Sequence, residues 1–149
     1  MKAKPYLTLA LLLGVHLLVM FALTYSGVAR LDHVFVNLNR FYMAVLMVAP
    51  MAILMVAAMW HMFPNTKANI AIIGTAVLVF AMTFGAIRDQ TFVGDTQFLR
   101  SMIPHHSIAI KTCENAHYDD AEIDRLCDDI VEAQREEIAE MRQILSRLD

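Results

Sequence analysis

The chain has 149 residues, of which 58% are hydrophobic and 18% are charged, and its mean hydropathy is +0.49. These values exclude a disordered chain, a collagen and a disulfide-rich miniprotein, and they are atypical of an ordinary soluble domain. The first 87 residues carry a net charge of +4, whereas the last 62 carry −7. We therefore expect two domains, a membrane domain at 1–88 and an acidic domain at 89–149. No basic patch is present to displace phosphate counterions, so nucleic acid is not an expected partner.

Three stretches without Asp, Glu, Lys or Arg divide the first domain, and they contain 25, 26 and 20 residues (5–29, 41–66 and 68–87). Each reaches the roughly 20 residues that a helix needs to cross a bilayer. Tyr and Trp bracket the first two stretches, as is typical of membrane interfaces (Tyr6, Tyr25, Tyr42 and Trp60). We expect three transmembrane helices, at about 6–26, 42–62 and 69–87, with the lipid bilayer as a partner.

The first stretch also resembles a signal peptide, because Lys2 and Lys4 precede it. It is longer than the usual signal core of roughly 7–15 residues and has no clear cleavage site, so a retained anchor is favoured. Basic residues are balanced across the membrane, three on each side (Lys2, Lys4 and Lys67 against Arg30, Arg40 and Arg88). The amino-terminal amine tips this count towards an inside amino terminus, which places the acidic domain outside.

In the acidic domain, apolar residues recur at spacings of three and four, which predicts two helices at about 95–117 and 120–148 joined by a short turn. The expected inward face of the first includes Phe98. Asp95 or Thr96 is expected to cap the first helix and Asp119 or Asp120 the second. Pro104 predicts a bend before His105. Because two helices make a thin core, we expect the hairpin to pair with a second copy as a four-helix bundle, or to lie against the membrane domain.

Six sulfur and imidazole side chains lie on the expected inward faces of these helices: Met102, His105, His106, Cys113, Cys127 and Met141. Met102 and His106 are one helical turn apart. Thioether, imidazole and thiolate groups together suit copper(I), while imidazole with thiolate suits zinc. The alternative for each methionine is packing. The two cysteines have three alternatives, namely buried hydrophobes, metal thiolates or a disulfide across the hairpin.

Residues 95–148 carry a more specific pattern. An acid and Phe precede Met102-Ile-Pro-His-His-Ser-Ile-Ala-Ile110, and Gln134-Arg-Glu-Glu-Ile-Ala-Glu-Met141 follows in the second helix. This pattern resembles the bacterial domain-of-unknown-function 305 family, and Asn37–Met43 resembles the multi-span region of some relatives. The resemblance implies a ferritin-like helical hairpin, often secreted or membrane-tethered, in which some members bind copper through Met and His ligands.

By the same resemblance, Met102, His105, His106 and Met141 are candidate ligands, and Gln134 and Glu137 are polar residues that could orient a histidine. Many relatives carry Met where this chain has Thr112, so Cys113 is a candidate replacement ligand. The bacterial family together with the count of basic residues leads us to expect a bacterial inner membrane protein whose carboxy-terminal domain faces the periplasm or the exterior.

The second hydrophobic stretch contains a methionine ladder, defined as Met43, Met47, Met51, Met55 and Met59, at a constant spacing of four. A four-residue step turns about 400°, so the ladder winds slowly around its helix. It resembles the Met-x-x-x-Met motif of three-span copper transporters. Such a row could relay copper(I), or it could be a packing surface between membrane helices.

We therefore predict an all-α, membrane-anchored protein that captures or buffers copper(I) in metal homeostasis or resistance. The alternative is a non-catalytic, membrane-tethered interaction module in which the Met/His cluster is only core. A di-iron enzyme is disfavoured because such sites need a Glu-x-x-His motif on each of two helices and the sequence holds only one, Glu114 with His117; no catalytic triad or phosphate loop is present either. We expect no enzymatic activity.

Overall fold

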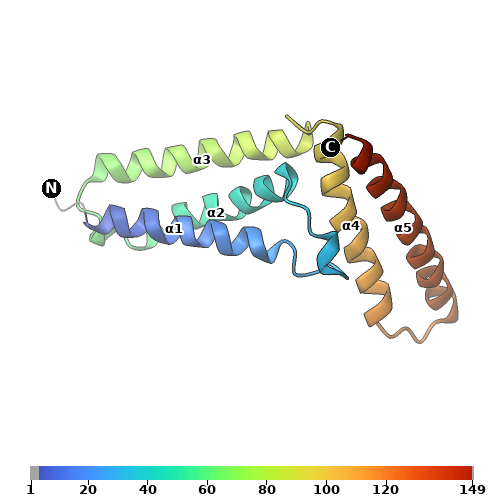
Figure 1. Ribbon diagram of the computed structural model, residues 1–149. Coiled ribbons are helices and arrows are strands. Elements are labelled where there is room, and N and C mark those ends of the chain that lie inside the picture. The colour runs from blue at the N-terminus through green and yellow to red at the C-terminus, as the bar shows by residue number, and fades with distance from the viewer. Residues whose placement is uncertain (1–3, 149) are drawn as a thin grey trace. The chain divides into compact units, whose positions relative to one another are not determined.

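The computed structural model describes residues 4–148, and within them it contains five α-helices, two short 3-10 helices and no strand (Figure 1). The prediction of an all-α fold is confirmed. The chain forms two compact units. The first, here the span unit, comprises the residues up to Thr24 together with Asn39–Thr91. The second, here the hairpin unit, comprises Tyr25–Leu38 and the residues from Phe92 onward.

Within residues 4–148, three helices are long and apolar enough to cross a membrane: α1 (Lys4–Leu23), α2 (Leu38–Ala58) and α3 (Thr66–Arg88). At about 1.5 Å per residue, their 20, 21 and 23 residues span the hydrocarbon thickness. Helix α2 ends four residues earlier than expected, and a 3-10 turn follows at Trp60–Met62. Phe63 after this turn is extended, because Pro64 disfavours helical geometry at the residue that precedes it.

The span unit has a small apolar core and a polar contact near the start of α1. Leu9, Val56 and Phe63 are buried together. The Tyr6 hydroxyl donates to Oδ1 of the fully buried Asn69 at 2.9 Å, and Asn69 Nδ2 donates to the Phe63 carbonyl at 3.1 Å. These bonds satisfy a buried amide that would otherwise be costly in an apolar surrounding. They therefore fix the beginning of α1 against that of α3.

The hairpin unit is built on α4 (Asp95–Asn115) and α5 (Ala121–Leu148), which run antiparallel side by side (Figure 1). Asp120 caps α5 as expected, because its Oδ1 accepts from the backbone N–H of Glu122 at 2.8 Å. The expected cap of α4 is wrong: its N-cap is Gly94, and Asp95 lies in the first turn. A carboxylate there still favours the helix through the dipole.

The core of the hairpin unit lies on a different edge of α4 from the one expected. Phe98 is exposed, whereas Leu99, Ile103 and Ile110 are buried with residues of α5. The reason is that α4 has two covered faces, since the segment 25–38, which includes a 3-10 turn at Leu31–His33, packs on it as well. Sequence reasoning had assigned 25–38 to the membrane domain at 1–88.

Backbone-directed hydrogen bonds attach the segment 25–38 to α4. Asn37 Nδ2 donates to the Arg100 carbonyl at 3.1 Å, and Gln97 Oε1 accepts from the Leu38 N–H at 2.9 Å. At the other end, the Ala29 N–H donates to Ser107 Oγ at 2.8 Å. The segment therefore follows α4 over several turns and covers a face that a two-helix hairpin would leave open.

Candidate metal centre

The antiparallel register of α4 and α5 brings predicted site residues together at two levels of the hairpin, one helical turn apart. His106 of α4 faces Glu137 of α5, with 2.9 Å between Nδ1 and Oε2. Met102, four residues earlier in α4, packs against the apolar cluster that contains Met141, four residues later in α5. A four-residue step keeps Met102 and His106 on one face of α4, and it keeps Glu137 and Met141 on one face of α5. Met102, His106 and Met141, here the Met/His cluster, therefore lie along the same inter-helix seam.

His106 is the best-enclosed imidazole of this seam, with a side chain 14% exposed. Burial lowers the pKa of His106, the Glu137 carboxylate opposes that effect, and the neighbouring His105 adds to it. The ring is therefore neutral near pH 7, which is the form that binds metals. Its Nδ1 atom is buried and makes no hydrogen bond of acceptable geometry, in spite of the short approach of Glu137.

The two methionines differ in burial. Met141 is buried in the core with Leu99 and Ile138, and Met102 is partly buried at its edge. Both positions fit gap-filling packing as well as coordination, because a thioether is soft, flexible and apolar. The structure thus places both sulfur side chains in one cluster.

His105 lies outside this interior. Its side chain is exposed, and its ring centroid is 6.0 Å from that of His106 with the planes tilted by 60°. Adjacent helical residues point about 100° apart, so the two imidazoles cannot share the inner face. Gln134, on the outer part of α5, donates to Glu137 Oε2 at 3.3 Å and so joins the carboxylate that faces His106.

Cys113 and Cys127 form a disulfide between the end of α4 and the beginning of α5, with a Cα–Cα distance of 5.3 Å. Of the three alternatives for these cysteines, the structure contains the disulfide. Their sulfurs are not thiolates in this state and so are not metal ligands, because the thiolate is the coordinating form. Thr112 does not replace them, since its hydroxyl donates to the Ile108 carbonyl at 2.9 Å.

Across residues 4–148, no group of three or more His, Cys, Asp or Glu side chains is arranged to hold a metal ion. A metal bound along the hairpin seam would depend on the thioether sulfurs of the Met/His cluster.

The methionine ladder of α2 changes its environment along the helix. Met43, Met47 and Met51 are 43%, 42% and 40% exposed, whereas Met55 and Met59 pack against the core of the span unit. This change follows from the winding of a four-residue repeat around a helix of 3.6 residues per turn. Pro50 lies inside α2 without interrupting it.

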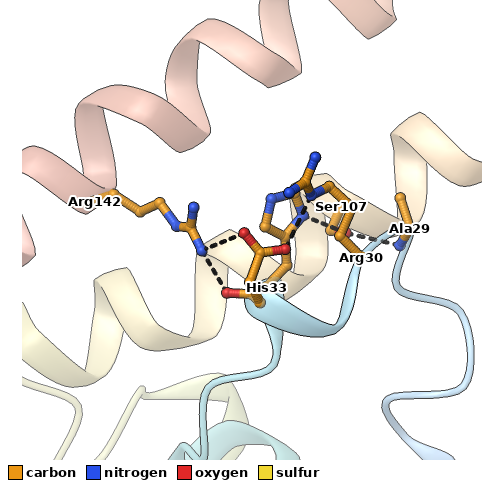
Figure 2. A network of polar contacts seen from close by, with 6 residues as sticks. Ala29, Arg30, His33, Ser107 and Arg142 are labelled. Carbon is orange, nitrogen blue, oxygen red and sulfur yellow. Dashed lines mark hydrogen bonds and ion pairs between the residues drawn. The ribbon is translucent and has the colours of Figure 1, made fainter.

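Sequence reasoning missed a polar cluster on the segment 25–38, shown in Figure 2. His33 is buried, and its Nδ1 lies 2.8 Å from Ser107 Oγ. Asp32 accepts from Arg30 and from Arg142 of α5, at 2.9 Å in each case. The hydrogen bond from Arg30 is the main reason that the pKa of Asp32 is lowered to about 2. The available signal was that Asp32 is the only acid among the first 87 residues.

Comparison with known proteins identifies the hairpin. The family described as "Domain of unknown function (DUF305)" matches residues 82–146. An uncharacterized protein of Acanthamoeba polyphaga mimivirus, L153, is 39% identical over 112 residues, covering 73% of this chain and 71% of the viral protein. No solved structure matches the chain. The viral relative does not support the bacterial origin that the resemblance implied.

Proposed function

The chain belongs to the DUF305 family, and from that membership we propose that it is a membrane-anchored protein that captures or buffers copper(I) in the seam of its helical hairpin. In this proposal Met102, His106 and Met141 are the ligands, and the exposed His105 is an additional donor at the rim. The function is binding in metal homeostasis or resistance, without catalysis.

The observation that carries the proposal is the approach of Glu137 to His106, one turn from the apolar cluster to which Met141 belongs and against which Met102 packs. A carboxylate beside one ring nitrogen fixes the orientation and tautomer of a histidine ligand. In this proposal the ring proton of neutral His106 is on Nδ1, the nitrogen 2.9 Å from Glu137 Oε2, and the lone pair that would bind the metal is on Nε2.

The chemistry of the donors favours copper(I) over other cations. Thioether sulfurs are soft ligands and bind hard or borderline ions poorly, whereas copper(I) accepts them at low coordination number. The lowered pKa of His106 keeps its ring unprotonated, so protons compete weakly for the nitrogen. Thioethers and imidazole, unlike thiols, are not removed from coordination by disulfide formation.

The disulfide supports the placement of the hairpin unit on the non-cytosolic side of the membrane, because such bonds persist in oxidising compartments. Intact cells that produce the full chain would be reduced and then exposed to a membrane-impermeant thiol reagent. We expect labelling of Cys113 or Cys127 without permeabilisation. Labelling only after permeabilisation would place the hairpin in the cytosol.

The proposal is tested by copper(I) titration of the full chain in detergent, without oxygen and without thiol reductants, in competition with a coloured copper(I) chelator. Met102→Leu combined with His106→Leu should weaken binding by more than the roughly 100-fold typical of changes to outer-shell partners, with unchanged circular dichroism. The matched control, Met82→Leu with His117→Leu, changes the same residue types outside the seam. Equal copper(I) affinity of the double variant and the wild type would refute the assignment.

A second candidate is a non-catalytic interaction module, favoured by the burial of Met141 in the apolar core and by the partial burial of Met102 beside it. In that case the Met/His cluster serves packing alone. The same titration separates the two functions, because the module predicts no competition for copper(I) by the wild-type chain and a lower melting temperature for the double variant.

A further inference from the structure

A pocket of about 530 Å³ lies within the hairpin unit, between the segment 25–38, α4 and α5. This volume is in the range of small-molecule sites. Its apolar lining consists of Ala29, Ile110, Ile138 and Ala139. None of the residues of the Met/His cluster lines the pocket, so the pocket is separate from the proposed copper site. An inference about the pocket therefore does not depend on the copper proposal.

Three arginines and two carboxylates form the polar lining of the pocket. Arg30 donates through Nε to Asp32, Arg142 donates through one terminal nitrogen to Asp32, and Arg135 donates through one terminal nitrogen to Glu114 (Figure 2 shows the first two arginines). A guanidinium carries five N–H donors. Each of these arginines therefore keeps several donors that no group of the described residues accepts.

His33 adds an uncharged donor to the lining. Ser107 is fully buried, and its Oγ accepts from the Ala29 N–H. Among residues 4–148, its one other polar contact is with His33 Nδ1. A Ser107 hydroxyl hydrogen directed to Nδ1 satisfies both groups and leaves the ring proton of His33 on Nε2. Burial lowers the pKa of His33, which keeps the ring neutral near pH 7.

We propose that this pocket binds a small organic monoanion, a carboxylate with a short aliphatic chain, whose charged end is held by Arg30 and its arginine neighbours while its chain covers Ala29 and Ala139. Two resident carboxylates against three guanidiniums leave one positive charge, which a monoanion neutralises and a polyanion exceeds. Arginine binds carboxylates in a bidentate manner. The apolar lining gives the chain of the ligand a surface to cover.

The charge of the surroundings supports this specificity. The last 62 residues carry a net charge of −7, so the hairpin region as a whole repels anions. The three arginines that line the pocket make it a locally positive region within this negatively charged part of the chain. Arg30 and Arg135 have side chains 71% and 64% exposed, which leaves their unused donors open to an incoming ligand.

The test is calorimetric titration of the full chain in detergent with hexanoate, and separately with the neutral hexanamide and with inorganic phosphate, each corrected for empty micelles. We expect saturable hexanoate binding with a dissociation constant on the order of 1 mM or below. Hexanamide and phosphate should each bind at least about tenfold more weakly, because one lacks the charge and the other lacks the apolar chain.

Two variants locate the binding. Arg30→Gln removes an exposed guanidinium, and Ala139→Leu fills the apolar lining; each should weaken hexanoate binding about tenfold or more without altering the melting temperature. Arg147→Gln, an arginine of α5 outside the pocket, is the matched control and should bind as the wild type does. Equal binding of hexanamide or phosphate, unchanged binding by Arg30→Gln, or no saturable heat with hexanoate would each overturn the proposal.

Discussion

The span unit and the hairpin unit are both helical, but they differ in the kind of side chain that they expose. Of the twenty residues of α1, only Leu9 is buried, and leucines such as Leu7, Leu11 and Leu18 are exposed. In α5 the buried residues form one stripe, Cys127, Ile138, Met141 and Leu145, with charged residues around it. An apolar outer surface suits lipid, while an amphipathic helix suits water.

This difference shows where each unit must be specific. Helices in lipid gain little from burying apolar residues against one another, and the span unit has a buried polar contact, that of Tyr6 with Asn69, beside its small apolar core. The hairpin unit is small for a water-exposed domain, and it adds a covalent link and a docked segment to its core. The following changes should therefore affect the two units separately.

Removal of the disulfide should have the largest effect. Cys113→Ser with Cys127→Ser opens a loop with a sequence separation of 14, which costs about 3 kcal/mol of unfolding free energy in the chain-entropy account. Hydrogen exchange of the full chain in detergent should accelerate in α4 and α5 and remain unchanged in α1, α2 and α3. Equal acceleration in the spans would mean that the two units do not unfold independently.

Loss of the Tyr6 hydroxyl should have a smaller effect, confined to the other unit. Tyr6→Phe leaves Asn69 Oδ1 buried without its donor, at a cost of about 1–3 kcal/mol. Exchange should accelerate at the beginning of α1 and α3. Tyr118→Phe is the control, because its hydroxyl makes no hydrogen bond within the described residues. Exchange at these positions that is no faster in Tyr6→Phe than in the control would contradict the account of this contact.

Acidification should produce the smallest effect, again in the hairpin unit alone. Burial lowers the pKa of His33 and of His106 below the ordinary 6.5, so the folded state binds fewer protons than the unfolded state. The stabilisation is complete above pH 6.5 and is lost as the pH falls below it. The hairpin should melt at a lower temperature at pH 5.5 than at pH 7.5, and His33→Gln should reduce that difference. An unchanged difference would argue against a neutral, buried His33.

Local patterns in the sequence predict most of the secondary structure and miss the long-range contacts. The uncharged stretches locate α1, α2 and α3, and the cap at Asp120 follows from its short side chain. The burial of Leu99 in place of Phe98 does not follow from periodicity, because it depends on a segment about seventy residues earlier in the chain. Tertiary contacts of this kind decide which edge of a helix is covered.

For the candidate site too, the sequence predicts which residues share a helix face but not which residues meet across the two helices. Spacing places Met102 and His106 on one face, but only the register of α4 against α5 pairs His106 with Glu137. Cys113 and Cys127 were left open because a turn of unknown geometry sets their relative heights, and the structure joins them. The pocket of Arg30, Arg135 and Arg142 carries no local motif, because its residues come from three separate elements.

The most direct test of the central claim is X-ray absorption at the copper edge of the full chain loaded with one equivalent of copper(I). The account predicts sulfur and nitrogen neighbours in one shell, with the sulfur contribution lost in Met102→Leu combined with Met141→Leu and kept in Met43→Leu combined with Met47→Leu. A shell without sulfur in the wild-type chain, or one that persists in the first variant and disappears in the second, would contradict a copper site in the hairpin.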